Sequence, residues 1–212
     1  MSLGSRFFAA TYDRLGAAVE KAGLSAHRHA LLAGAGGRVI EIGAGTGANL
    51  GFYGDSVQQL TLTEPEEAMA KRLERRAKDH SLPIELVRAS AEDLPFDDGY
   101  FDVAVSTLVL CSVDDQAQAL QELRRVLKPS GRLLFAEHVR ADDSRLAGWQ
   151  DRLNWFNRFV GQGCNCNRAT VEGIRAAGFT IAELERDKLH KVPPIIRPLA
   201  VGMAYPNGTP KG

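Results

Sequence analysis

The chain has 212 residues and carries 26 basic and 26 acidic side chains, so its formal net charge is zero. Hydrophobic residues make up 44% of it and charged residues 25%, which is typical of a globular domain and excludes a fibrous or wholly disordered chain. The balanced charge also argues against a broad nucleic-acid-binding surface, because such surfaces carry an excess of Lys and Arg.

The first 36 residues are predicted to form a helical flap. Apolar side chains recur there at spacings of three to five, which places them on one face of a helix. This stripe consists of Phe7, Phe8, Tyr12, Leu15 and Val19. A glycine-rich stretch at 34–37 then ends the helical pattern.

From residue 38 the pattern changes to short apolar runs separated by amphipathic segments. Strands are predicted at 38–42, 59–63, 84–87, 101–105, 132–136, 180–184 and 199–205, and helices at 66–79 and 117–127. Alternating strands and helices predict an α/β fold, a doubly wound, mostly parallel, Rossmann-like sheet of seven strands. Residues 37–212 are expected to form this domain, with a helical lid inserted at about 142–177.

The first predicted strand runs directly into a glycine-rich loop, Glu41-Ile42-Gly43-Ala44-Gly45-Thr46-Gly47. Such a loop lets a ligand approach the backbone closely. Gly43, Gly45 and Ala48 satisfy the dinucleotide-binding fingerprint, and Glu64 stands where an acid would bind ribose hydroxyls. An NAD(P)-dependent oxidoreductase is therefore an open alternative at this point.

Glu41 favours a different ligand. Its carboxylate stands two residues before the first glycine of the loop, where it would repel a pyrophosphate and attract a cation. S-adenosylmethionine carries an ammonium and a sulfonium and no phosphate. The sequence therefore favours this cofactor over a dinucleotide.

Five segments in order resemble the motifs of class I S-adenosylmethionine-dependent methyltransferases. They are 39–47 (VIEIGAGTG), 62–69 (LTEPEEAM), 89–96 (ASAEDLPF), 101–110 (FDVAVSTLVL) and 123–131 (LRRVLKPSG). The resemblance covers roughly residues 38–140 and is nearest to the type 11 small-molecule group. The strings at 107–113, 137–139 and 163–165 further resemble the thiol-methylating, methyltransferase-like proteins.

The resemblance implies a set of cofactor-binding residues. Glu64 would accept the ribose hydroxyls, Ser90 and Glu92 would face the adenine, and Leu108 would line the cofactor cleft. The full set is Glu41, Gly43, Ala44, Gly45, Thr46, Gly47, Glu64, Pro65, Met69, Ser90, Ala91, Glu92, Thr107 and Leu108.

The expected reaction is an in-line transfer of the sulfonium methyl group to a small thiol, phenol or quinone-like acceptor. His138, just past the fifth strand, is the candidate general base. Tyr12, Trp149, Trp155 and Phe156 are candidates to cap the acceptor, although helix packing would explain them equally well. A non-catalytic cofactor-binding module is a further alternative.

Other features indicate what the chain is not expected to contain. No apolar run is long enough to span a membrane, and three cysteines make no complete disulfide framework, so a cytoplasmic protein is expected. Cys164-Asn165-Cys166 has poor spacing for a metal site, and none is expected. The basic run Lys71, Arg72, Arg75, Arg76 and Lys78 is predicted to be a solvated helix face, without bound nucleic acid.

Overall fold

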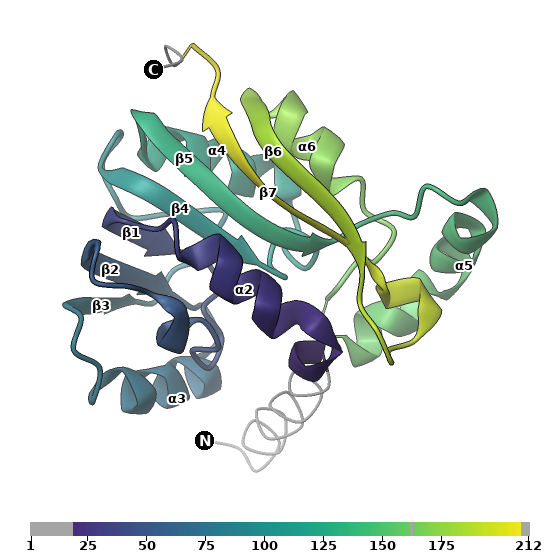
Figure 1. The fold of residues 1–212 in the computed structure, drawn as a ribbon, viewed down its shortest axis with the longest axis horizontal. Helices are drawn as coiled ribbons and strands as arrows, with labels where there is room; N and C mark the ends of the chain where they lie inside the picture. The colour runs from purple at the N-terminus through teal and green to yellow at the C-terminus, as the bar shows by residue number, and fades with distance from the viewer. Residues whose placement is uncertain (1–18, 162, 209–212) are drawn as a thin grey trace.

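A computed structural model of the chain describes residues 19–161 and 163–208 (Figure 1). Most of the predicted apolar stripe of the flap, from Phe7 to Leu15, lies outside these residues. The described helices are η1 Glu20–Leu24, α2 Ser25–Leu32, η2 Leu50–Phe52, α3 Glu67–Ala77, α4 Gln116–Val126, α5 Ser144–Val160, α6 Thr170–Ala176 and η3 Pro194–Ile196. The strands are β1 Gly37–Glu41, β2 Val57–Thr63, β3 Ile84–Val87, β4 Phe101–Thr107, β5 Leu127–His138, β6 Phe179–Lys188 and β7 Pro198–Pro206.

The seven strands form one sheet in the order β3-β2-β1-β4-β5-β7-β6. Strands β1 to β5 pair in parallel, whereas β7 is antiparallel to both β5 and β6. The predicted doubly wound, mostly parallel sheet of seven strands is confirmed. Because the strand order reverses beside β1, the carboxyl ends of β1 and β4 border the crevice where ligands of such sheets bind.

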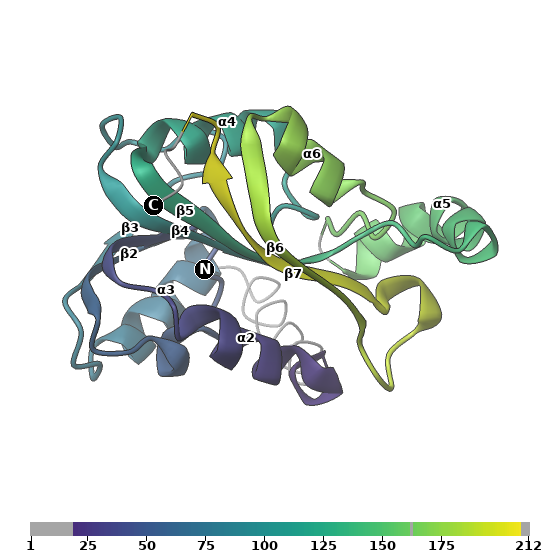
Figure 2. The ribbon, with the colours of Figure 1, turned by 45° about the horizontal axis from the view of Figure 1, so that its top comes forward.

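Helices cover both faces of the sheet, with α2 and α3 on one side and α4 and α6 on the other (Figure 2). Successive residues of β1 therefore enter different cores, since side chains alternate along a strand. Val39 packs with Leu32 of α2 and Leu73 of α3, whereas Ile40 packs with Leu123 of α4 and Ile174 of α6. This two-sided burial explains why the central strands read as continuous apolar runs.

Strand β5 is longer than the predicted 132–136. Leu127 already pairs with Phe101 of β4, and a register shift between Phe101 and Val103 lets the strand continue through residues 129–131. Pro129-Ser130-Gly131, a sequence typical of a turn, is thus an irregularity within the strand. The extra length also carries β5 to His138, at the carboxyl edge of the sheet.

The lid expected between β5 and β6 consists of α5 and α6, and α5 projects away from the sheet (Figure 1). Buried Gln150 anchors this helix, because its Nε2 donates to the carbonyl oxygens of Cys166 at 2.8 Å and Ile195 at 2.9 Å. The aromatic side chains of α5 remain outside, with Trp149 55% and Trp155 72% exposed. Their predicted role in capping the acceptor stays a prediction, and Tyr12 lies outside the described residues.

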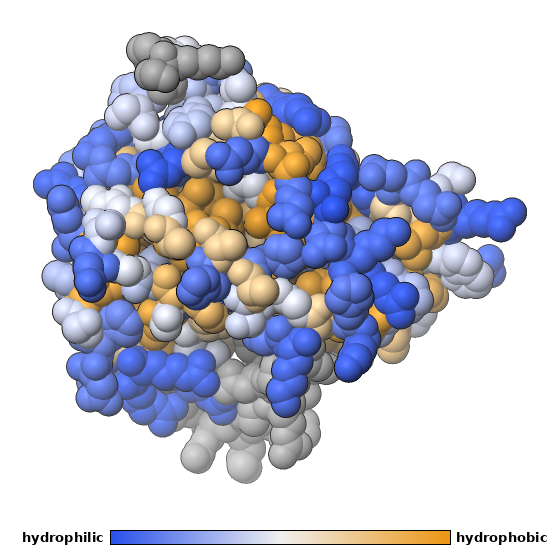
Figure 3. Space-filling view, viewed as in Figure 1, coloured by the Kyte–Doolittle hydropathy of each residue, from blue (hydrophilic) through white to orange (hydrophobic). Residues whose placement is uncertain are grey.

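The molecular surface in this view is largely hydrophilic, with apolar patches between charged groups (Figure 3). Within residues 19–161 and 163–208, no helix combines the length and the apolarity needed to cross a membrane.

Candidate active site

The glycine loop after β1 requires its glycines. Gly43, Gly45 and Gly47 have φ angles of 53°, 59° and 88°, in the left-handed region that side chains disfavour. A Cβ at Gly43 would lie 2.8 Å from the Val109 side chain, and one at Gly47 would lie 2.7 Å from Leu50. The backbone can therefore turn tightly at the edge of the sheet only without side chains here.

Glu64 follows β2 and faces this loop. One carboxylate oxygen accepts the N–H of Gly45 at 2.8 Å, and the other accepts the N–H of Glu66 at 2.9 Å. The side chain is buried, and burial raises the pKa of Glu64 above its usual value. Two backbone donors therefore orient a largely dehydrated carboxylate beside the predicted cofactor loop.

Thr46 of the same loop is held from helix α3. Arg76 Nη1 donates to the carbonyl oxygen of Thr46 at 2.8 Å and to its Oγ1 at 3.2 Å. Arg76 is exposed, as predicted for this basic run, and it also holds the glycine loop through these contacts. The ion pairs of Lys71 with Glu67 and of Lys78 with Glu74 are exposed, as expected.

Glu41 lies at the end of β1 in a buried polar pocket. Tyr53 donates its hydroxyl to Glu41 Oε2 at 2.5 Å. Burial raises the pKa of the Glu41 carboxyl to about 7, although the Tyr53 hydroxyl opposes this shift. Glu41 is therefore poised to lose or gain a proton near neutral pH when the charge around it changes.

Arg28 of helix α2 joins the flap to the strand edge. Its Nη1 donates to Asn49 Oδ1 at 2.5 Å and to Thr107 Oγ1 at 2.7 Å, while its Nε donates to Glu20 at 2.9 Å. The side chain is only 6% exposed. No residue pattern indicates this network, because its members come from four separate segments of the chain.

We expect Arg28→Ala to lower the free energy of unfolding by about 2–4 kcal/mol, because it leaves buried Asn49 and Thr107 without their charged donor. Urea denaturation of the purified chain measures this loss. Arg145→Ala, at an exposed position of α5, is the control. Equal losses in the two variants would show that the buried contacts of Arg28 contribute no net stability.

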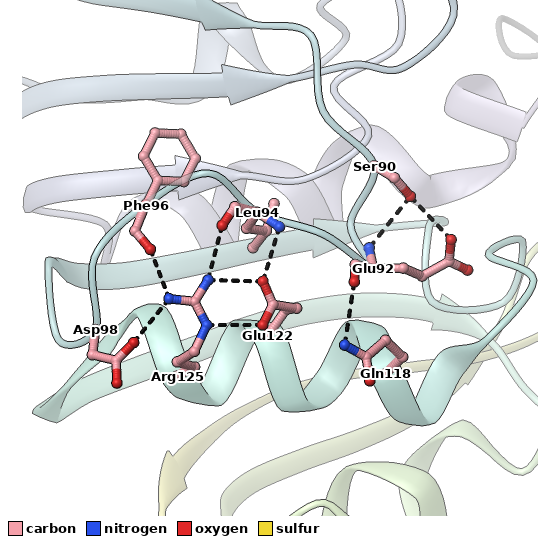
Figure 4. A network of polar contacts seen from close by, with 8 residues as sticks. All are labelled: Ser90, Glu92, Leu94, Phe96, Asp98, Gln118, Glu122 and Arg125. Atoms are coloured by element: carbon pink, nitrogen blue, oxygen red, sulfur yellow. Dashed lines mark hydrogen bonds and ion pairs between the residues drawn. The ribbon is translucent and has the colours of Figure 1, made fainter.

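The predicted adenine loop is anchored on helix α4 (Figure 4). Arg125 donates to the carbonyl oxygens of Leu94 at 2.8 Å and Phe96 at 2.6 Å, and it pairs with Glu122 at 2.8 Å. At the start of the loop, Ser90 donates its hydroxyl to Glu92 at 3.0 Å. These contacts fix the position of the loop relative to α4.

The remaining predicted cofactor residues lie near the same edge. Ala44, Thr46, Met69, Ala91 and Thr107 are buried, Leu108 is half-buried, and Pro65 directly follows Glu64 and is exposed. Leu108 has a left-handed backbone with φ of 59°, which is strained for a residue other than glycine.

Glu137 of β5 holds the strained segment after β4 in place. Its Oε1 accepts the Ser106 hydroxyl at 2.6 Å and the N–H of Val109 at 3.1 Å, while Oε2 accepts the N–H of Cys111 at 3.1 Å. This fully buried carboxylate has no role in the sequence-based prediction. Its contacts with backbone donors could not be read from residue spacing.

His138, the predicted general base, is buried beside two cysteines. Its Nδ1 lies 3.4 Å from Cys164 Sγ, which in turn lies 3.7 Å from Cys111 Sγ. The pKa of the Cys111 thiol is held well above its usual value, chiefly by Cys164 and also by burial. Nε2 of His138 has no hydrogen-bond partner among the described residues.

A family profile described as "Methyltransferase domain" matches residues 40–135. The human thiol S-methyltransferase TMT1B is 38% identical over 177 residues, which cover 81% of this chain and 70% of the relative. The human thiol S-methyltransferase TMT1A is 35% identical over 78% of this chain and 69% of the relative. The chain belongs to the S-adenosylmethionine-dependent methyltransferases.

This assignment resolves the ambiguity of the glycine loop in favour of a small-molecule methyltransferase over an oxidoreductase. A solved S-adenosylmethionine-dependent methyltransferase from Thermotoga maritima has the same fold, with a TM-score of 0.70 and 24% identity over 95% of this chain and 98% of that one. The [4+2]-cyclase SpnF has it too, with a TM-score of 0.69 and 20% identity over 88% of this chain and 81% of SpnF. The fold alone therefore does not decide the chemistry of the acceptor side.

Proposed function

We propose that this methyltransferase transfers the methyl group of S-adenosylmethionine to the thiol of a small molecule. The extent of the similarity carries this proposal. The match to human TMT1B covers 81% of the chain, well beyond the matched family segment at 40–135. The match to a ubiquinone/menaquinone C-methyltransferase from Proteus mirabilis covers only 47% of it. The thiol-methylating relatives thus also resemble the chain beyond its cofactor motifs.

In this proposal Glu64 binds the ribose of the cofactor. A carboxylate has about four lone-pair positions, and backbone N–H groups of Gly45 and Glu66 occupy two of them. The other two positions accept the ribose hydroxyls in short, charge-assisted hydrogen bonds. The backbone contacts hold the carboxylate in one orientation, so little further ordering is needed on binding.

Glu41 and the adenine loop complete the cofactor site of this proposal. The Glu41 carboxylate attracts the ammonium of the cofactor, directly or through water. Ser90 donates its hydroxyl to Glu92, so its oxygen has a lone pair to accept the adenine amino group. Thr107 and Leu108 line the cleft from the end of β4.

The transfer itself needs positioning more than acid–base chemistry. The thiolate sulfur attacks the sulfonium methyl group in line, and the electron pair of the breaking bond goes to the cofactor sulfur, leaving S-adenosylhomocysteine. Since this leaving group is already activated, alignment and exclusion of water supply much of the rate. A thiol that arrives as a thiolate needs no general base.

The test is an acceptor screen with the purified chain and S-adenosylmethionine carrying a labelled methyl group. We expect label in a small alkyl or aryl thiol, and none in the phenol or quinone of matching size. Glu64→Ala, assayed at the same cofactor concentration, should lose most of this transfer.

Two results would contradict the proposal. Labelling of the phenol or quinone without the thiol would assign another acceptor atom. Binding of S-adenosylhomocysteine without transfer to any of the three classes would favour the non-catalytic module.

A further inference from the structure

Three side chains of metal-binding type meet at the carboxyl edge of the sheet. Cys111 follows β4, His138 ends β5, and Cys164 lies in the loop between α5 and α6. One ligand atom from each lies within 4.8 Å of those of the other two, and all three residues are buried. Cys166, two residues after Cys164 in the chain, lies outside this cluster. Its Sγ is 3.9 Å from Asn154 Oδ1.

Two of the three separations are close to the edges of a zinc tetrahedron, and the third, between Cys111 and His138, is within 4.8 Å. Zinc bonds of ~2.3 Å to sulfur and ~2.05 Å to nitrogen imply tetrahedral edges of ~3.8 Å between sulfurs and ~3.6 Å between sulfur and nitrogen. The structure has 3.7 Å between the sulfurs of Cys111 and Cys164 and 3.4 Å between Cys164 Sγ and His138 Nδ1. A disulfide would instead need the two sulfurs to approach to ~2.05 Å.

The charge of such a site suits its burial. Two thiolates and one neutral imidazole balance the two positive charges of zinc, so the loaded site has no net charge. Binding releases the two thiol protons to solvent.

The backbone around the cluster is already held in place. The Cys111 N–H donates to Glu137 at 3.1 Å, and the Cys111 carbonyl accepts the N–H of Asn165 at 2.8 Å. The Cys164 carbonyl accepts Asn157 Nδ2 at 2.7 Å. These contacts fix the two cysteines relative to β5, as outer contacts do at metal sites.

We propose that Cys111, His138 and Cys164 bind one zinc ion whose fourth coordination position takes the sulfur of the methyl acceptor. Two cysteines and one histidine with an open fourth position are a known catalytic zinc ligand set. The role at the fourth position rests on the proposed thiol acceptor. It makes His138 a metal ligand in place of a general base.

The chemistry of the fourth position follows from the charge of the metal. A thiol that coordinates zinc loses its proton to solvent and reaches the cofactor as a thiolate. When its sulfur bonds to the methyl carbon, the sulfonium bond breaks and its electron pair stays on the cofactor sulfur. The neutral thioether is a weaker ligand than the thiolate and leaves the metal.

Metal binding is tested on the full chain, washed with chelator and kept in a phosphine reductant. One equivalent of Co²⁺ should give a thiolate-to-cobalt charge-transfer band and the intense visible bands of a tetrahedral site, and zinc should abolish both. Cys111→Ser, Cys164→Ser and His138→Ala should bind zinc about 100-fold more weakly or worse. Cys166→Ser, another buried cysteine, is the matched control and should keep the bands.

Circular dichroism of each variant checks that it folds. The cobalt spectrum of the natural chain tests the proposal even if a variant fails to fold. Absence of both cobalt bands in the natural chain would overturn the metal site. Bands that persist in both Cys111→Ser and Cys164→Ser would overturn this ligand set.

The fourth position has its own test. Adding a small alkyl thiol to the cobalt-loaded chain should shift the charge-transfer band, whereas a phenol of similar size should not. An unchanged band with a thiol that is nevertheless methylated would overturn the role of the metal in acceptor binding. A thiol that shifts the band but is never methylated would contradict the proposed function and leave the metal site standing.

Discussion

Glu64→Ala should weaken the binding of S-adenosylhomocysteine on the order of 100-fold. The substitution removes two charge-assisted hydrogen bonds to the ribose, each contributing at least about 1.5 kcal/mol. It also frees the N–H groups of Gly45 and Glu66, which the carboxylate now accepts. Isothermal titration calorimetry of the purified variant measures the change directly.

Two variants separate ribose binding from a general loss of structure. Glu64→Gln keeps one oxygen acceptor and should lose less affinity than Glu64→Ala. Glu74→Ala removes an equal charge from an exposed position of α3 and should bind normally. An affinity of Glu64→Ala equal to that of the natural chain would refute the role of this carboxylate.

The second large effect is a proton released from Glu41 when the cofactor binds. The pKa of this carboxyl is about 7 in the chain without cofactor, and the nearby cofactor ammonium should lower it. Affinity should therefore rise up to about tenfold per pH unit between about pH 5.5 and 7. Calorimetry in two buffers of different ionisation enthalpy counts the released proton.

Glu41→Gln should remove both the proton release and this pH dependence, while Glu74→Gln should keep them.

The effect of Glu41 on stability has the opposite dependence on pH from its effect on cofactor binding. Since the folded pKa lies above the unfolded value of 4.5, the stability from Glu41 is present below pH 4.5 and lost as pH rises through about 7. At pH 8 Glu41→Gln should therefore have a higher free energy of unfolding than the natural chain, by at most about 3 kcal/mol. Urea denaturation of both proteins measures this difference. A binding profile that stays pH-dependent in Glu41→Gln would assign the proton to another group.

Some features of this methyltransferase follow from sequence alone because they depend on local patterns. The apolar run of β1 and the amphipathic stripes of α3 and α4 encode burial, so the doubly wound, mostly parallel sheet could be predicted. The positive φ angles after β1 follow from glycines at fixed spacing. The predicted role of Glu64 in ribose binding follows from its place directly after β2. The amino-terminal end of β5 does not follow from the sequence, because the register shift that extends this strand comes from its pairing with β4.

The tertiary structure alone decided which distant side chains meet. Arg28, Asn49 and Thr107 form one hydrogen-bonded network, although no periodicity relates them. The spacing of Cys164 and Cys166 predicts no metal site, but the ends of adjacent strands place Cys111 and His138 beside Cys164. Residue patterns encode which side chains are buried, whereas strand order and register determine their neighbours. The chemistry of the acceptor side therefore emerges only when the sheet is assembled.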